Sequence, residues 1–206
     1  MATTTNYGWT TPDNTDLVKD GAAAIRTLGS SIDTSMNAAL GTKKAGMVLL
    51  NTTSFSGVTT QSVNDVFSST YDNYLILFNY FANGGGTTFR LRASGTDNSN
   101  ANYITRGVSD SDAAVSSVRA NAQTSAGLAT VSSSANFGAR HVMQILGPNL
   151  SGATSMYTET MYSTSTSAGE GYYLRATHRE TYQATGFTII NAANMTGSLS
   201  VYGYNK

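Results

Sequence analysis

The spacing of apolar residues changes partway along this chain, and that change constrains the fold more than any other feature. In Leu17–Leu40, a segment rich in Ala and free of Pro, apolar residues recur every seven positions. From Ala45 onward apolar and polar residues alternate, as in Thr87–Ala93. Helices give the first spacing and half-buried strands give the second. The sequence therefore predicts an N-terminal helical segment over residues 1–41 and a β-domain over residues 42–206.

The β-domain contains many short candidate strands separated by Gly, Asn, Asp and Ser. Alternation means one buried and one solvated face, which is typical of antiparallel sheets. Strands of this kind without intervening helices indicate a sandwich or barrel, and we expect a mainly β fold, an antiparallel jelly-roll-like β-sandwich. The expected strands are Met47–Asn51, Ser62–Phe67, Asn73–Ala82, Thr87–Ala93, Tyr103–Val108, Ala114–Arg119, Gly127–Ser132, Phe137–Leu146, Thr154–Thr164, Gly171–Arg179, Phe187–Asn191 and Ser198–Tyr204.

The helical segment has signals at both ends. Before it, Thr11-Pro12-Asp13-Asn14 combines a Pro, which is tolerated at a first helical position, with side chains that cap free N–H groups. After it, Gly41 can end the helix in the left-handed conformation. We therefore expect one helix between these two points.

The expected helix carries a thin apolar stripe, which makes it marginal by itself. Two partners are open for this stripe: the body of the same chain, or copies of the helix in a parallel bundle. We favour the bundle, a homotrimer, because Ile at the repeating position is compatible with a bundle of three helices. The candidate trimerisation residues are Val18, Ile25, Leu28, Ile32 and Met36.

Composition argues against several classes of protein. Lys plus Arg and Asp plus Glu are both 12, so the net charge is +0, and we expect no nucleic-acid partner. No apolar run approaches the roughly 20 residues of a spanning helix, so we expect no membrane insertion, and we recognise no secretory signal. The chain has no Cys and therefore no disulfide. Its 40% of hydrophobic residues indicate a folded domain rather than disorder.

Signals for catalysis or metal binding are weak. The two His, His141 and His178, match no metal-ligand spacing, and we interpret His178 with Glu180 as a surface pair. No nucleophile-elbow pattern surrounds a Ser. We therefore expect no enzymatic activity, no metal and no cofactor.

Tyr residues gather in the last third of the chain. Tyr combines an apolar face with a polar tip, which suits both subunit interfaces and stacking on sugars. We expect most of them to fill the sandwich, with a subunit interface and a glycan site as alternatives. Tyr172 and Tyr173 are the candidate ligand-binding residues, with the ligand unidentified.

Three motifs stand near the N-terminus: Asn6-Tyr7-Gly8-Trp9-Thr10-Thr11-Pro12, Leu17-Val18-Lys19-Asp20-Gly21-Ala22 and Ile25-Arg26-Thr27-Leu28-Gly29. Together they resemble the N-terminal segment of tailed-bacteriophage virion appendage proteins of the short fibre, head fibre or decoration spike type. Near the other end, Thr196–Tyr204 is similar to the closing strand of phage fibre and decoration sandwiches. The chain lacks the shaft of long fibres, which favours a short fibre, a head fibre or a capsid-bound spike.

The resemblance implies a structural component of a phage particle, located in the virion and assembled in the host cytoplasm. The N-terminal segment would dock on the particle through Tyr7, Trp9 and Pro12, while the β-domain projects outward, with adhesion to the host surface as a further role. The implied partners are copies of the chain, other virion proteins of the head, adaptor or tail, and a host-surface glycan or receptor. The alternative is a receptor- or glycan-binding tail fibre protein, or a capsid decoration protein.

Overall fold

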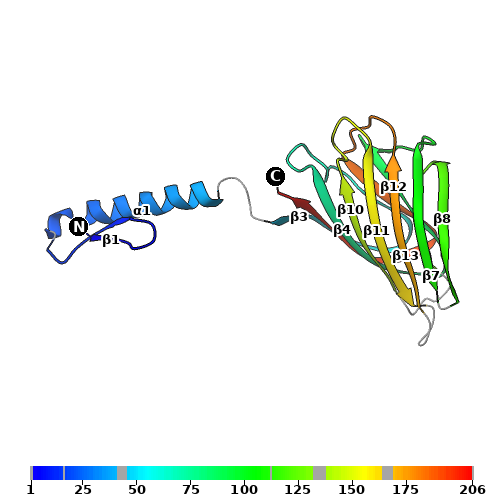
Figure 1. The fold of residues 1–206 in the computed structure, drawn as a ribbon, viewed down its shortest axis with the longest axis horizontal. Coiled ribbons are helices and arrows are strands. Elements are labelled where there is room, and N and C mark those ends of the chain that lie inside the picture. Colours follow the sequence, from blue (N-terminus) through cyan, green and yellow to red (C-terminus); the bar gives the residue numbers. More distant parts are fainter. Residues whose placement is uncertain are drawn as a thin grey trace. The chain divides into compact units, whose positions relative to one another are not determined.

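The computed structural model describes residues 2–15, 17–40, 46–111, 113–131, 138–163 and 169–205. The chain divides into two compact units, Met1–Ala45 and Gly46–Lys206. Each unit has its own elements and internal contacts (Figure 1).

A short hairpin and one long helix form the N-terminal unit. Strand β1 (Ala2–Thr3) pairs antiparallel with β2 (Thr10–Thr11), and helix α1 spans Val18–Leu40. The helix confirms the prediction for this segment. The hairpin could not be predicted, because two-residue strands are too short to show alternation. The helix end and domain boundary expected at Gly41 lie outside the described residues.

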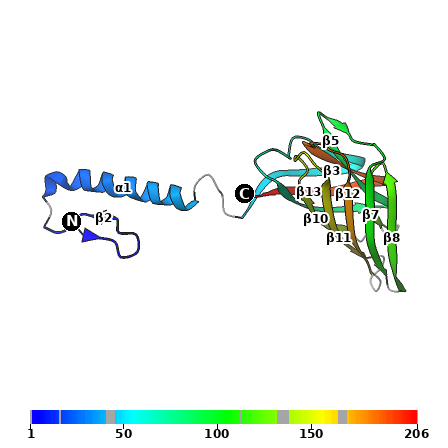
Figure 2. The same cartoon turned by 45° about the horizontal axis from the view of Figure 1, so that its top comes forward.

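The second unit is an antiparallel sheet that curls back on itself, as two views of it show (Figures 1 and 2). Its main path runs β6-β5-β13-β4-β10-β11-β12-β7-β8, with β3 beside β13 and β9 beside β5. Because the sheet curls, β9 also contacts β7, β11 and β12. The unit is therefore mainly β and sandwich-like. Its strands are β3 Met47–Val63, β4 Asn73–Ala82, β5 Gly85–Ala93, β6 Thr96–Asp97, β7 Tyr103–Ser111, β8 Ala114–Gln123, β9 Ala126–Val131, β10 Ala139–Leu146, β11 Thr154–Ser163, β12 Gly169–His178 and β13 Gly186–Tyr204.

Strands β3 and β13 form a long ribbon, in which β13 connects β5 to β4 within the sheet. On one edge β13 pairs with β3 over most of its length. On its other edge it pairs first with β5, through Gly186–Asn191, and then with β4, through Met195–Gly203. Register shifts between Ile190 and Gly197 accompany the change of partner, which is how irregular pairing usually bends a strand.

The sequence predicted two separate strands where the structure has the single strand β3, and two more where it has the single strand β13. Both predictions are wrong. Met47–Asn51 and the first part of Ser62–Phe67 both belong to β3. Phe187–Asn191 and Ser198–Tyr204 both belong to β13. The residues between them are mostly Thr, Ser, Asn and Gly, which resemble a loop in sequence but are held extended by pairing along the ribbon. The strand ends expected at Ser132, Phe137 and Thr164 lie outside the described residues.

Aromatic and aliphatic side chains fill the core inside the curl. Tyr74, Phe89 and Phe187 are fully buried, and the rings of Phe89 and Phe187 stack with centroids 5.2 Å apart. Along β10 and β11 buried residues alternate with exposed ones, as one-sided burial requires. The outward side chains of β10, β11, β12 and β7 consequently share one solvent-facing surface.

Candidate functional site

The docking candidates lie in and beside the N-terminal hairpin. Tyr7 and Trp9 belong to the loop between β1 and β2, and their rings stack with centroids 4.9 Å apart. Trp9 is half-buried, and its Nε1 donates a 2.9 Å hydrogen bond to Ser35 Oγ of α1. Tyr7 and Pro12 are exposed. Trp9 therefore attaches the hairpin to the helix, while Tyr7 and Pro12 present their side chains to solvent.

The five trimerisation candidates fall into two groups. Val18 is 98% exposed, Ile25 64% and Met36 54%. Leu28 and Ile32 are half-buried. Three of the five thus present apolar side chains to solvent on a helix that is marginal without a partner.

The hairpin contacts α1, and its Trp9 bonds to a second line of residues along the helix. Gly21, Leu28 and Ser35 follow at seven-residue intervals, all three are half-buried, and Ser35 holds Trp9. An adjacent line of residues on the helix surface advances by alternating steps of four and three positions, which is the spacing of a coiled-coil seam. We call this line the helix seam; its residues are Val18, Ala22, Ile25, Gly29, Ile32 and Met36.

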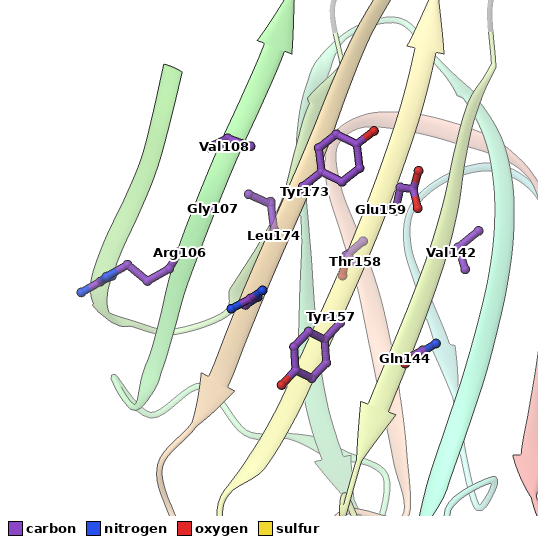
Figure 3. Close-up of a pocket in the computed structure, with 11 residues that line it drawn as sticks. Arg106, Gly107, Val108, Val142, Gln144, Tyr157, Thr158, Glu159, Tyr173 and Leu174 are labelled. Carbon is purple, nitrogen blue, oxygen red and sulfur yellow. The ribbon is translucent and has the colours of Figure 1, made fainter. Parts of the chain in front are cut away.

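A second feature lies on the outward surface of the β-domain, where a shallow groove of about 580 Å³ crosses β10, β11, β12 and β7 (Figure 3). Tyr157 and Tyr173 are 43% and 51% exposed, and both side chains stand on this surface with Glu159 beside them. We call this feature the sheet groove. Its aromatic, charged and amide-bearing residues are Arg106, Gln144, Tyr157, Glu159, Tyr173 and Arg175.

Strand register aligns these side chains in rows, because residues directly opposite each other in an antiparallel pair point to the same face. One row runs across β10, β11, β12, β7 and β8 and consists of Gln144, Tyr157, Arg175, Arg106 and Arg119. The adjacent row consists of Val142, Glu159, Tyr173, Val108 and Ser117. The sheet groove therefore places two Tyr rings, one carboxylate and two guanidinium groups on neighbouring positions, and a third guanidinium, that of Arg119, continues the first row beside the groove.

Hydrogen bonds fix Arg106 at one side of this surface. Its Nη1 donates 2.8 Å hydrogen bonds to the backbone oxygens of Thr105 and Ala120, and its Nη2 donates to Asn121 Oδ1. The guanidinium of Arg175 lies 5.9 Å from the centroid of the Tyr157 ring. Within the described part of the chain, no carboxylate forms an ion pair with Arg106, Arg119 or Arg175.

The structure separates the two predicted ligand-binding residues. Tyr173 lines the sheet groove, whereas Tyr172 packs against the core beside Tyr162, with ring centroids 6.3 Å apart. Sequence reasoning did not single out Tyr157 or Arg175. Alternation along Thr154–Thr164 and Gly171–Arg179 carries that signal, since it puts Tyr157 with Glu159 and Tyr173 with Arg175 on shared faces.

The interpretation of His178 with Glu180 as a surface pair is wrong for the His. His178 is fully buried beside Tyr103, with ring centroids 4.6 Å apart, and only Glu180 reaches solvent. Burial lowers the pKa of His178, and the adjacent Glu180 partly opposes that effect. Neighbouring amides lower the pKa of Glu180, because Asn98 and Asn100 donate hydrogen bonds to its carboxylate.

Comparisons with known proteins assign no family to this geometry: no family model, no curated protein and no solved structure matches the chain. In the part of the chain that the structure describes, no helix is long and apolar enough to cross a membrane. The same residues include no group of three or more His, Cys, Asp or Glu placed to hold a metal ion.

Proposed function

We propose that this protein is a non-enzymatic structural component of a phage particle, a short homotrimeric fibre or spike. In this proposal the N-terminal unit docks on other virion proteins through Tyr7, Trp9 and Pro12, and the β-domain, with a jelly-roll-like arrangement, projects outward. The observation that carries the proposal is the exposed helix seam. The N-terminal motifs that resemble phage appendage proteins lie in the same unit and support it.

The helix seam is suited to copies of itself. Val18 and Ile25 recur at one seam position, and branched residues there are compatible with trimers. Ala22 and Gly29 at the other position are small, and a Cβ added at Gly29 would meet nothing within 4 Å. The helices of a second and a third copy could therefore approach α1 closely and cover the side chains of the helix seam, which the hairpin of the same chain leaves exposed.

Sedimentation of the full chain at micromolar concentration tests the trimer. We expect three times the monomer mass for the wild type, and a shift to monomer for Ile25→Asp, because a charge would be buried in the bundle. Thr27→Asp is the matched control, since two helical steps place residue 27 on the opposite side of α1. A monomeric wild type, or equal effects of the two variants, would overturn the trimer.

Incorporation into particles tests the docking role. Replacing Tyr7 by Ala should reduce the amount of protein in purified virions, since this exposed ring is free to contact another virion protein. Thr5→Ala, an exposed change in the same loop, should leave incorporation intact. Equal incorporation of both variants would place the docking surface elsewhere.

A second candidate function is binding of a saccharide on the host surface, and the sheet groove is the observation that favours it. Exposed Tyr157 and Tyr173 rings offer flat apolar faces, and Gln144 and Glu159 offer groups that hydrogen-bond hydroxyls. A glycan array probed with the wild type and Tyr173→Ala tests it, with Phe81→Ala as control, an exposed aromatic on the neighbouring β4. If Phe81→Ala lost the glycan-array signal while Tyr173→Ala kept it, this candidate function would be wrong.

A further inference from the structure

We propose that the sheet groove binds an acidic saccharide, whose carboxylate groups pair with the row of three arginines formed by Arg175, Arg106 and Arg119. This inference rests on the second candidate function above and names its ligand class. It does not depend on the oligomeric state of the protein.

Positive charge repeats across three neighbouring strands of this surface. Arg175 faces Arg106 directly across β12 and β7, and Arg106 faces Arg119 directly across β7 and β8. Like charges directly opposite each other destabilise a sheet. The chain has few charged residues, 12% in all, yet three of the same sign adjoin in one row. A bound anion would turn that cost into attraction.

Uncharged groups hold two of these arginines in place. The partners of Arg106 are two backbone carbonyls and an Asn amide, which orient the guanidinium without neutralising it. Arg175 lies over the Tyr157 ring, again an uncharged partner. In the described part of the chain the row thus keeps its positive charge, and guanidinium groups form strong charge-assisted hydrogen bonds with carboxylates.

A nucleic acid would also bind to Arg and Tyr side chains, but the carboxylate of Glu159 favours a sugar over it. Glu159 stands between Val142 and Tyr173 in the adjacent row, and its carboxylate would repel the phosphates of an extended strand. A saccharide with spaced acidic groups avoids that clash, because its hydroxyls can donate to Glu159 while its carboxylates reach the arginines. The exposed ring of Tyr173 stands directly opposite Glu159, two residues from Arg175 on the same strand.

Calorimetric titration of the full chain with oligogalacturonate tests the proposal, and the same oligomer with methyl-esterified carboxyls is the neutral comparison. We expect at least about tenfold weaker binding of the ester, since a hydrogen bond to a charged group is worth that much. Arg175→Gln and Arg119→Gln should each weaken binding of the acid by about the same factor. Affinity should also fall as salt is added.

Arg140→Gln is the matched control, because Arg140 lies on the same face in β10 but opposite Asn79 and Met161, outside the arginine row. It should leave affinity unchanged. Thermal melting supplies a second readout: relief of repulsion should raise the midpoint of Arg119→Gln at low salt while ligand binding weakens.

Several results would overturn the acidic ligand. Equal affinity for the acid and its ester would do so while leaving saccharide binding in place, and absence of binding to both would remove carboxylated sugars. A loss in Arg140→Gln as large as in Arg175→Gln would show a general charge effect. Tighter binding of a single-stranded oligonucleotide than of oligogalacturonate would assign the groove to nucleic acid instead.

Discussion

His141 is an ionisable group enclosed by the core of the β-domain. Its ring stacks on Phe78 with centroids 4.0 Å apart and on Tyr80 at 5.3 Å, and its Nδ1 shares a 2.7 Å hydrogen bond with Thr160 Oγ1. Among the described residues, nothing partners its Nε2. Burial therefore lowers the pKa of His141 from 6.5 to about 3, because the charged ring would lose its hydration.

This residue should make stability depend on pH. Below about 6.5 the unfolded chain binds a proton at His141 that the folded chain does not bind until about pH 3, so stability falls as pH is lowered through that window. The slope from one such group is about 1.4 kcal/mol per pH unit. In His141→Gln the free energy of unfolding, measured with urea between pH 7 and 4, should vary less steeply by about that amount. Identical slopes in the wild type and the variant would contradict a buried neutral His141. The slope that remains in the variant belongs partly to His178, whose pKa is also lowered by burial.

Gly107 lines the sheet groove at a point where β7 and β12 lie very close together. A Cβ built there would lie 2.0 Å from the backbone oxygen of Tyr173, so β7 can approach β12 this closely only without a side chain. Gly107→Ala should lower the free energy of unfolding by about 1–3 kcal/mol, as overpacking does. Gly127→Ala is the control, because its nearest added contacts, to Thr105, are at 3.8 Å. Denaturant titration would compare the two, and equal losses would refute the close approach as the cause.

At the scale of elements, sequence periodicity predicted the helix and the strands whose apolar residues recur at a regular spacing. The helix over Val18–Leu40 and strands such as Asn73–Ala82 follow from spacing alone. The hairpin of β1 and β2 does not, because its strands are too short to show alternation and its contact with α1, the Trp9 bond to Ser35, joins residues far apart in the chain. The continuity of β3 and β13 was also missed, because pairing between the two strands, rather than local preference, keeps their Thr- and Ser-rich centres extended.

The sheet groove could not be predicted from local sequence patterns, for a related reason. Alternation indicates that Tyr173 and Arg175 share a face, but it cannot say which residues stand opposite them. Register across β7, β11 and β12 makes that choice, pairing Arg175 with Arg106 on one side and Tyr157 on the other. The pairing of β7 with β12 joins segments separated by four other strands in sequence. The identity of one candidate, Tyr173, could thus be predicted, whereas the site around it could not.

At the scale of the whole molecule, the two units should have separable functions. The β-domain has its own closed core, so a chain beginning at Gly46 should remain soluble and folded. Without the helix seam it should sediment as a monomer, and without the hairpin it should no longer enter particles. It should keep the saccharide affinity of the full chain per site, because every residue of the sheet groove lies after Gly46.

Circular dichroism, sedimentation and calorimetry on the deleted chain measure these three properties, and each outcome bears on a different proposal. A trimer that persists without residues 1–45 would move the subunit interface from α1 to the β-domain, where exposed Leu49, Phe81 and Val115 would then need explanation. Retained incorporation into particles would likewise move docking away from Tyr7. Weaker binding per site would mean that the N-terminal unit contributes to ligand contact. Unchanged affinity in a monomer would establish that the seam adds copies of the groove without altering it, and three linked grooves then raise avidity through effective concentration alone.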